Sequence, residues 1–293
     1  MDNTTLRTPI SEKGISAEMF DAYLGDFVTT KLTSKEVKQV GKVNGIEYKL
    51  MIRLTRWTGR TTPAQIVVLS RLFWANYPKM YERFGAAGES PTEITLDIEN
   101  KGYGIAWNMG KLVHLHDGWL ERCKEDYDCI THELAHAIQN GWDGETLEYD
   151  SFIERFADAC RFLYAFNNGE FNDKDWQMQV LDREPTREDS VRFLVWFDYF
   201  YSTEDNDLLL NYFKVCRGEK YPKAQWKEAW AEIFKGSALE GRDIDDIYAE
   251  YGYYFDCLET FVLKGKEGAE KIQSAMTAMR ESGAELFDDL EIL

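Results

Sequence analysis

The residues with the clearest potential for chemistry are two histidines and two glutamates near the middle of the chain. His132, Glu133 and His136 form an H-E-x-x-H motif, and Glu154 follows eighteen positions after the second histidine. Histidines four residues apart lie on one face of a helix, so both imidazoles can bind the same ion. Glu133 is turned by about 100° from His132, so it can flank that ion without binding it. The pattern predicts a zinc site with three protein ligands and a general base.

Two helices are expected to carry these residues, one over about 126–140 and one over about 150–165. Each has an apolar stripe on the side away from the candidate ligands, as a helix packed on a core requires. The segment 141–144, Gly-Trp-Asp-Gly, interrupts the helical pattern between them. The two helices can therefore fold back on each other and bring Glu154 towards the histidines.

Asp158 lies one helical turn after Glu154 and is a candidate for the support of the metal site. A carboxylate at this position can accept the free N–H of a ligating imidazole and so fix its tautomer. The alternative for Asp158 and Glu154 is an exposed acidic helix face, because the chain carries a net charge of −18. An alternative metal site of the Cys2His2 type would combine His114 and His116 with Cys123 and Cys129, although their spacing matches no zinc-finger pattern.

Composition limits the function classes. The strongly negative charge argues against nucleic acid and against anionic membrane surfaces, because both bind basic proteins. No run of 18 apolar residues is present, so no membrane span is expected. The first residues lack the features of a signal peptide, which predicts a cytoplasmic protein, or a secreted or periplasmic one if a leader was removed. Five cysteines at no framework spacing are expected to be reduced and mostly buried.

The order of patterns predicts an α+β fold with a small mixed sheet, then the metal-binding helix, then a mostly helical part. Strands are expected at 47–54, 93–98, 102–107 and 111–116, with a turn at 108–110 and a long helix at 64–84. We expect a polar lead-in over 1–45, a main domain over 46–254 and a helical tail over 255–293. The main domain would divide into an α/β lobe (46–141) and a helical lobe (142–254), with the metal helix at the floor of a cleft between them.

Several segments resemble, in the same order, those of a known family. They are 104–108, 112–115, 131–139, 152–158, 191–194 and 247–251. This order is similar to that of the basic secretory proteins of plants and bacteria, zinc-peptidase-like proteins of the thermolysin-type clan. The resemblance covers about residues 46–254 and implies a zincin-like fold. The chain departs from the family in its acidity, in its added tail at 255–293, and in having Arg155 where a glycine is usual.

The residues and the resemblance together predict a peptidase that uses one Zn²⁺ per chain and acts on a peptide or protein. Glu133 would be the general base, and one further group would stabilise the carbonyl oxygen. Tyr149, Tyr199 and Tyr201 are candidates for that group. The strand at 112–116 is expected to be an exposed edge for substrate pairing, which makes His114 a possible substrate neighbour or an ordinary strand histidine. The alternatives are a zinc-containing binding protein with little or no peptidase activity, and a hydrolase for a non-peptide substrate.

Overall fold

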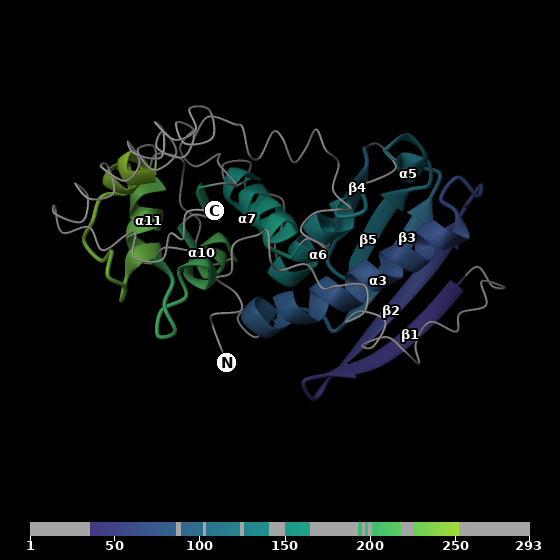
Figure 1. Cartoon of the computed structure of the whole chain (residues 1–293), viewed down its shortest axis with the longest axis horizontal. Helices are drawn as coiled ribbons and strands as arrows, with labels where there is room; N and C mark the ends of the chain where they lie inside the picture. The colour runs from purple at the N-terminus through teal and green to yellow at the C-terminus, as the bar shows by residue number, and fades with distance from the viewer. Residues whose placement is uncertain are drawn as a thin grey trace, which may run out of the picture.

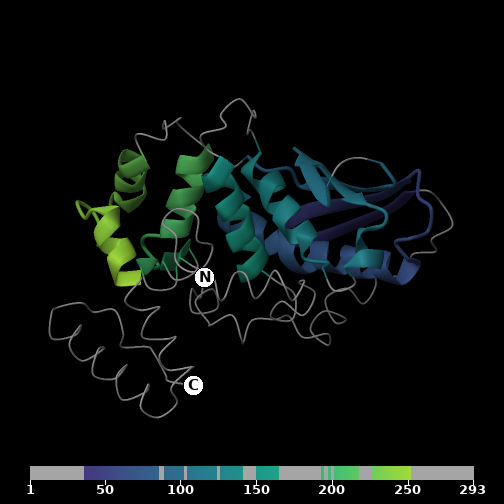
Figure 2. The same ribbon diagram turned by 90° about the horizontal axis from the view of Figure 1, so that it is seen from above.

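The computed structural model describes residues 36–85, 89–101, 104–123, 126–140, 150–164, 193–194, 197–198, 201–217 and 226–251. In these ranges a five-stranded mixed sheet is followed by helices, which confirms the predicted α+β class. Figures 1 and 2 show the sheet at one end and α10 (Leu208–Arg217) and α11 (Trp226–Phe234) at the other. The helices α6 (Cys129–Gln139) and α7 (Asp150–Leu163) lie between them.

The sheet has the strand order β1-β2-β3-β5-β4. Its strands are β1 (Glu36–Val43), β2 (Ile46–Thr55), β3 (Glu93–Glu99), β4 (Ala106–Met109) and β5 (Leu112–His116). The pairs β2–β3 and β3–β5 are parallel, whereas β1 and β4 run antiparallel to their neighbours. The strand at the edge beside β5 is therefore β4, and the prediction that 112–116 forms an exposed edge is wrong.

The hairpin between β4 and β5 exists, but its turn is one residue shorter and begins two residues later than predicted. Met109 pairs with Leu112, so residues 110 and 111 make a two-residue connection in place of 108–110. Gly110 has φ 60°, a conformation that glycine adopts without steric cost. The edge and the turn both depend on which strands pair, and the alternation of side chains along a single strand does not contain that information.

The strand β1 falls within the segment that we expected to be a polar lead-in. Two of its residues that face the core are Gln39 and Gly41, so a polar side chain and a glycine stand where apolar side chains are usual. Gln39 Oε1 accepts hydrogen bonds from Ser70 Oγ (2.6 Å) and Trp74 Nε1 (2.7 Å). A Cβ added at Gly41 would lie 2.7 Å from the Trp74 ring. The indole occupies the space that a core side chain of β1 would fill.

The long helix expected at 64–84 divides into α3 (Pro63–Met80) and one π-helical turn (Tyr81–Gly85). Thr62 begins α3 with a capping box, in which Thr62 and Gln65 each accept a hydrogen bond from the backbone N–H of the other. A short helix α5 (Trp119–Arg122) follows the sheet. The helix α6, which we expected to bind the metal, begins at Cys129, three residues later than the predicted start.

One continuous apolar core joins the sheet to the helices. The buried side chains of β2, β3 and β5 belong to the same cluster as those of α3, α6, α7, α10 and α11. The burial of this surface fixes α6 against the sheet and α7 against α6. None of the helices in the described ranges has the length and apolar character needed to span a bilayer.

Candidate metal centre

The H-E-x-x-H motif lies in α6, whose first turn is held by a buried polar network. Thr131 Oγ1 donates a hydrogen bond of 2.6 Å to Asp128 Oδ1, and Asn76 Nδ2 of α3 donates one of 2.7 Å to Thr131 Oγ1. All three side chains are buried. Because a buried polar group without a partner costs about 1–3 kcal/mol, this network favours one position of α6 against α3.

The C-terminal end of α6 is held from the helical part of the molecule. Arg217 Nε of α10 lies 3.0 Å from the carbonyl oxygen of Gln139 and 2.9 Å from that of Asn140. The last carbonyls of a helix have no partner within the helix, and they favour a cation nearby. Arg217 supplies both the donor and the charge, so α10 helps to position the ligand helix.

The second helix of the site, α7, is held by a buried ion pair and by aromatic packing. Arg161 Nη2 donates to Asp126 Oδ1 at 2.5 Å, and the two side chains are only 8% and 4% exposed. Phe156 packs edge-on against Phe84 of the π-helical turn, with 5.0 Å between ring centroids. These contacts orient α7 so that Glu154 and Asp158 face α6.

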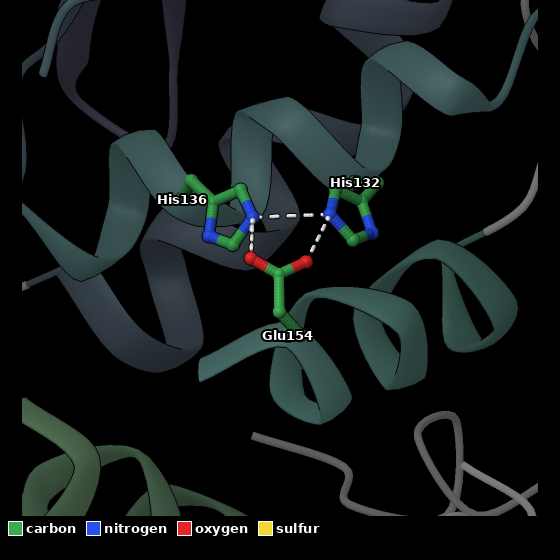
Figure 3. A group of neighbouring side chains, drawn as sticks. All are labelled: His132, His136 and Glu154. Atoms are coloured by element: carbon green, nitrogen blue, oxygen red, sulfur yellow. Dashed lines mark hydrogen bonds and ion pairs between the residues drawn. The ribbon is translucent and has the colours of Figure 1, made fainter. Parts of the chain in front are cut away.

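Three side chains from the two helices converge at one point, as Figure 3 shows. His132 Nε2 and His136 Nε2 are 3.0 Å apart. The carboxylate of Glu154 places one oxygen 3.2 Å from His132 Nε2 and the other 3.4 Å from His136 Nε2. The side chain of Glu154 is 43% exposed, so solvent can reach the site from the α7 side. The structure thus brings together the three ligand candidates that the sequence predicted.

The hydrogen bonds behind the two imidazoles decide their tautomers. His132 Nδ1 is 2.8 Å from Asp158 Oδ1, and His136 Nδ1 is 2.8 Å from Gln139 Oε1. Carboxylate and amide oxygens can only accept, so both Nδ1 atoms carry hydrogen and a neutral ring keeps its lone pair on Nε2. Gln139 Nε2 donates to the carbonyl oxygen of Ile153 at 3.4 Å, which orients this amide. Both Nε2 lone pairs therefore point into the space shared with Glu154.

Such a group of acceptors is stable only with a cation between them, either a proton or a metal ion. Burial by itself would lower the pKa of His132, but its hydrogen bonds to Asp158 and Glu154 outweigh burial and raise that pKa to about 10. Partial burial would raise the pKa of Glu154, but the hydrogen bonds from both histidines lower it well below its ordinary value. Without metal, a shared proton thus holds the group together, and metal binding has to displace it.

Glu133 lies beside these ligands and differs from them in having no partner. Its side chain is buried, and it makes no hydrogen bond or ion pair with any residue in the described ranges. Burial raises the pKa of Glu133 above the ordinary value for a glutamate, and the nearby His132 and His136 partly oppose that shift. A buried carboxylate with free acceptor oxygens and a raised pKa can accept a proton from a water molecule in the same site.

The sequence reasoning missed the role of Gln139. This side chain orients His136 as Asp158 orients His132, but with a neutral oxygen in place of a charged one. The signal was available, because Gln139 lies three residues after His136 on the same helix and can reach its ring. Arg155, which stands where the resembling family has glycine, places Nη1 3.3 Å from Asp158 Oδ2. It helps to hold the carboxylate that orients His132.

Two other candidate residues lie away from this group. His114 is 3% exposed and belongs to the inner strand β5, so it is not placed to contact a substrate. The Tyr201 hydroxyl donates a hydrogen bond to Glu250, which also pairs with Arg242. Tyr201 is therefore already engaged and is a poor candidate for the group that stabilises a carbonyl oxygen. Tyr149 and Tyr199 lie outside the described residues.

The alternative Cys2His2 site does not form. No three of its four members, His114, His116, Cys123 and Cys129, bring ligand atoms together. Cys123, Cys129 and Cys160 are reduced, and the last two are buried, as expected. Cys216 and Cys257 lie outside the part of the chain whose side chains are described.

Comparisons of the chain with protein-family models, with curated proteins and with solved structures found no match. We therefore infer its function from the geometry of the site.

Proposed function

We propose that this protein is a zinc-dependent peptidase in which Glu133 is the general base. The observation that carries the proposal is the buried, unpaired carboxylate of Glu133 beside three converging acceptors. A protein that only needed to hold an ion would gain nothing from such a carboxylate, because its burial costs free energy that no hydrogen bond from the described residues offsets.

The residues present fit a zinc ion. His132 Nε2, His136 Nε2 and a carboxylate oxygen of Glu154 would hold it, and Asp158 and Gln139 already orient both rings for ligation. Two imidazoles and one carboxylate are a common ligand set of catalytic zinc. Among the described residues no fourth ligand joins these three, which leaves a position for water as catalytic sites require. When bound, zinc would lower the pKa of a water molecule to about 7 and polarise the carbonyl group of a substrate.

The residues of the chain would then move the proton. Glu133 would accept it from the water that attacks the peptide carbonyl carbon, and would deliver it to the nitrogen of the leaving amine. Its raised pKa makes Glu133 a stronger base than an exposed glutamate, and its burial keeps the accepted proton within the site. His132 and His136 would stay neutral and fixed in orientation by Asp158 and Gln139 throughout.

The sheet supports a zincin-like fold and a place for the substrate. The edge strand β4 runs antiparallel to β5 and has no strand partner on its outer side among the described residues. An extended peptide could pair with this edge as an added strand. We propose β4 for this role, in place of the segment 112–116 that the sequence suggested. Membership of the basic secretory protein family remains a prediction from the resembling segments.

The proposal is tested by measuring metal content together with cleavage of a diverse peptide library. We expect one zinc at this site and cleavage that a chelator abolishes and added zinc restores. Full zinc occupancy without cleavage of any library member would contradict the peptidase proposal and favour a zinc-containing binding protein. Cleavage that resists the chelator would show that another site performs the reaction.

The contribution of Asp158 can be measured separately from that of the ligands. Asp158→Ala removes the acceptor of the His132 Nδ1–H and is expected to weaken zinc by about 10- to 100-fold, without loss of the fold. Competition with a coloured chelator measures the affinity, and circular dichroism checks the fold. Asp205→Ala, at an exposed loop aspartate, is the control. Equal affinity in the two variants would show that Asp158 is an ordinary helix residue.

A further inference from the structure

A second group of potential ligands lies on the face of the sheet opposite the core. Leu96 and Ile98 of β3 point into the core, so Asp97 and Glu99 point to the other side, because successive side chains of a strand alternate. Asp97 pairs in register with His114 on β5. One ligand atom from each of Asp97, Glu99 and His114 lies within 4.8 Å of the other two.

The hydrogen bond of His114 shows which ring nitrogen is available. Its Nε2 lies 3.1 Å from the carbonyl oxygen of Lys101, and a carbonyl can only accept. In the neutral ring the hydrogen is therefore on Nε2, and the lone pair is on Nδ1, which lies 3.9 Å from Glu99 Oε2. Trp107 of β4 stacks on the imidazole with 4.9 Å between ring centroids and holds its plane. A lone pair and a carboxylate thus face each other without a hydrogen between them.

The two carboxylates of this group are incompletely compensated. Asp97 Oδ2 accepts a hydrogen bond of 2.6 Å from Arg53, but Asp97 Oδ1 is buried and has no hydrogen-bond partner. The Asp97 side chain is only 7% exposed. Glu99 pairs with Arg56 Nη1 at 3.7 Å, and that arginine side chain is 63% exposed. One buried acceptor oxygen, one weakly paired carboxylate and one imidazole lone pair remain on the same side of the sheet.

We propose that Asp97, Glu99 and His114 bind a second divalent cation of the hard class that includes Mn²⁺. Two carboxylates and one imidazole favour such an ion more than a set rich in imidazole or thiolate does. The ion would bind Glu99, whose pairing with the exposed Arg56 is long, and would give Asp97 Oδ1 a partner. It would also join β3 to β5. The site does not depend on the proposed peptidase function, since it shares no residue with the first group.

The test uses the full chain loaded with one equivalent of zinc and titrated with Mn²⁺, with free Mn²⁺ followed by electron paramagnetic resonance. Zinc forms the more stable complexes with ligands of this type, so Mn²⁺ does not displace it from the first site. We expect one bound Mn²⁺ per chain, with a nitrogen coupling from the His114 ring. Glu99→Gln keeps the size of the side chain and is expected to weaken Mn²⁺ by at least about tenfold.

Two matched variants show where the ion binds. Glu93 lies on the same strand and pairs weakly with Lys111 at 3.9 Å. Glu93→Gln should therefore leave the Mn²⁺ affinity unchanged. The double variant His132→Ala, His136→Ala, titrated without zinc, should also retain Mn²⁺, because it removes only the first site. The proposal is overturned if the zinc-loaded chain binds no Mn²⁺, if Glu99→Gln binds it as tightly as Glu93→Gln does, or if the double variant loses it.

Discussion

Glu133→Gln is expected to lower the rate of peptide hydrolysis by about 10²-fold or more while the chain keeps its zinc. Glutamine has the same size and can still form hydrogen bonds, but it cannot accept a proton at neutral pH. Glu133 is absent from the converging group of ligand atoms, so its replacement should leave metal affinity nearly unchanged. Initial rates on a peptide that the wild type cleaves, with zinc measured in the same samples, give both quantities.

The pH profile of the wild type adds a second readout for this residue. The base has to be a carboxylate, so activity is expected to fall as the pH drops through the pKa of Glu133. Burial raises that pKa, which moves the acid limb above the value of about 4.3 for an exposed glutamate. The limb reports Glu133 and the attacking water titrating together. Glu228→Gln, on an exposed face of α11, serves as the control. A Glu133→Gln variant as active as this control would refute the role of Glu133.

His132→Ala and His136→Ala are each expected to abolish zinc binding at this site, and with it all hydrolysis. Each change removes one of the two Nε2 atoms, which are 3.0 Å apart and would both bind the ion. The remaining ligands cannot complete the site. Glu154→Ala should weaken zinc strongly but less completely, because both imidazoles remain. Mass spectrometry of the native protein, after dialysis against a weak chelator, measures the zinc retained.

His116→Ala is the matched control for these variants. His116 is a partly exposed histidine of β5 whose Nδ1 accepts a hydrogen bond from the backbone of Gly118, outside the site. It should retain full zinc. Full occupancy in His132→Ala or His136→Ala would refute the ligand assignment. Wild-type zinc affinity in Glu154→Ala would instead assign the third position to another residue.

The fold class and most of the candidate metal site could be predicted from local periodicity. A helix places residues four apart on one face, which is enough to pair His132 with His136 and Glu154 with Asp158. The structure confirms both pairs, because these relations lie within single helices. The strands β2 and β3 were predictable for the same reason, since apolar and polar residues largely alternate along both sequences.

Relations between elements were decided only by the tertiary structure. The sequence order of β4 and β5 does not show that β4 is the outer strand. The candidate edge for a peptide is therefore β4 and not β5, the strand that carries His114. The strand β1 was missed because two of its inward residues, Gln39 and Gly41, are suited to the Trp74 indole of α3 and not to an apolar pattern. The donors and acceptors that stabilise these side chains are far away in the chain, so no local pattern contains them.

Local spacing and tertiary packing both contribute to the candidate metal site. The chain determines by itself that His132, His136 and Glu154 are chemically suited to one ion. Packing decides that they meet, because the Arg161–Asp126 ion pair and the Phe156–Phe84 contact set the position of α7 against α6. Spacing along a helix is a property of the backbone, whereas the approach of two helices depends on side chains that the core brings together.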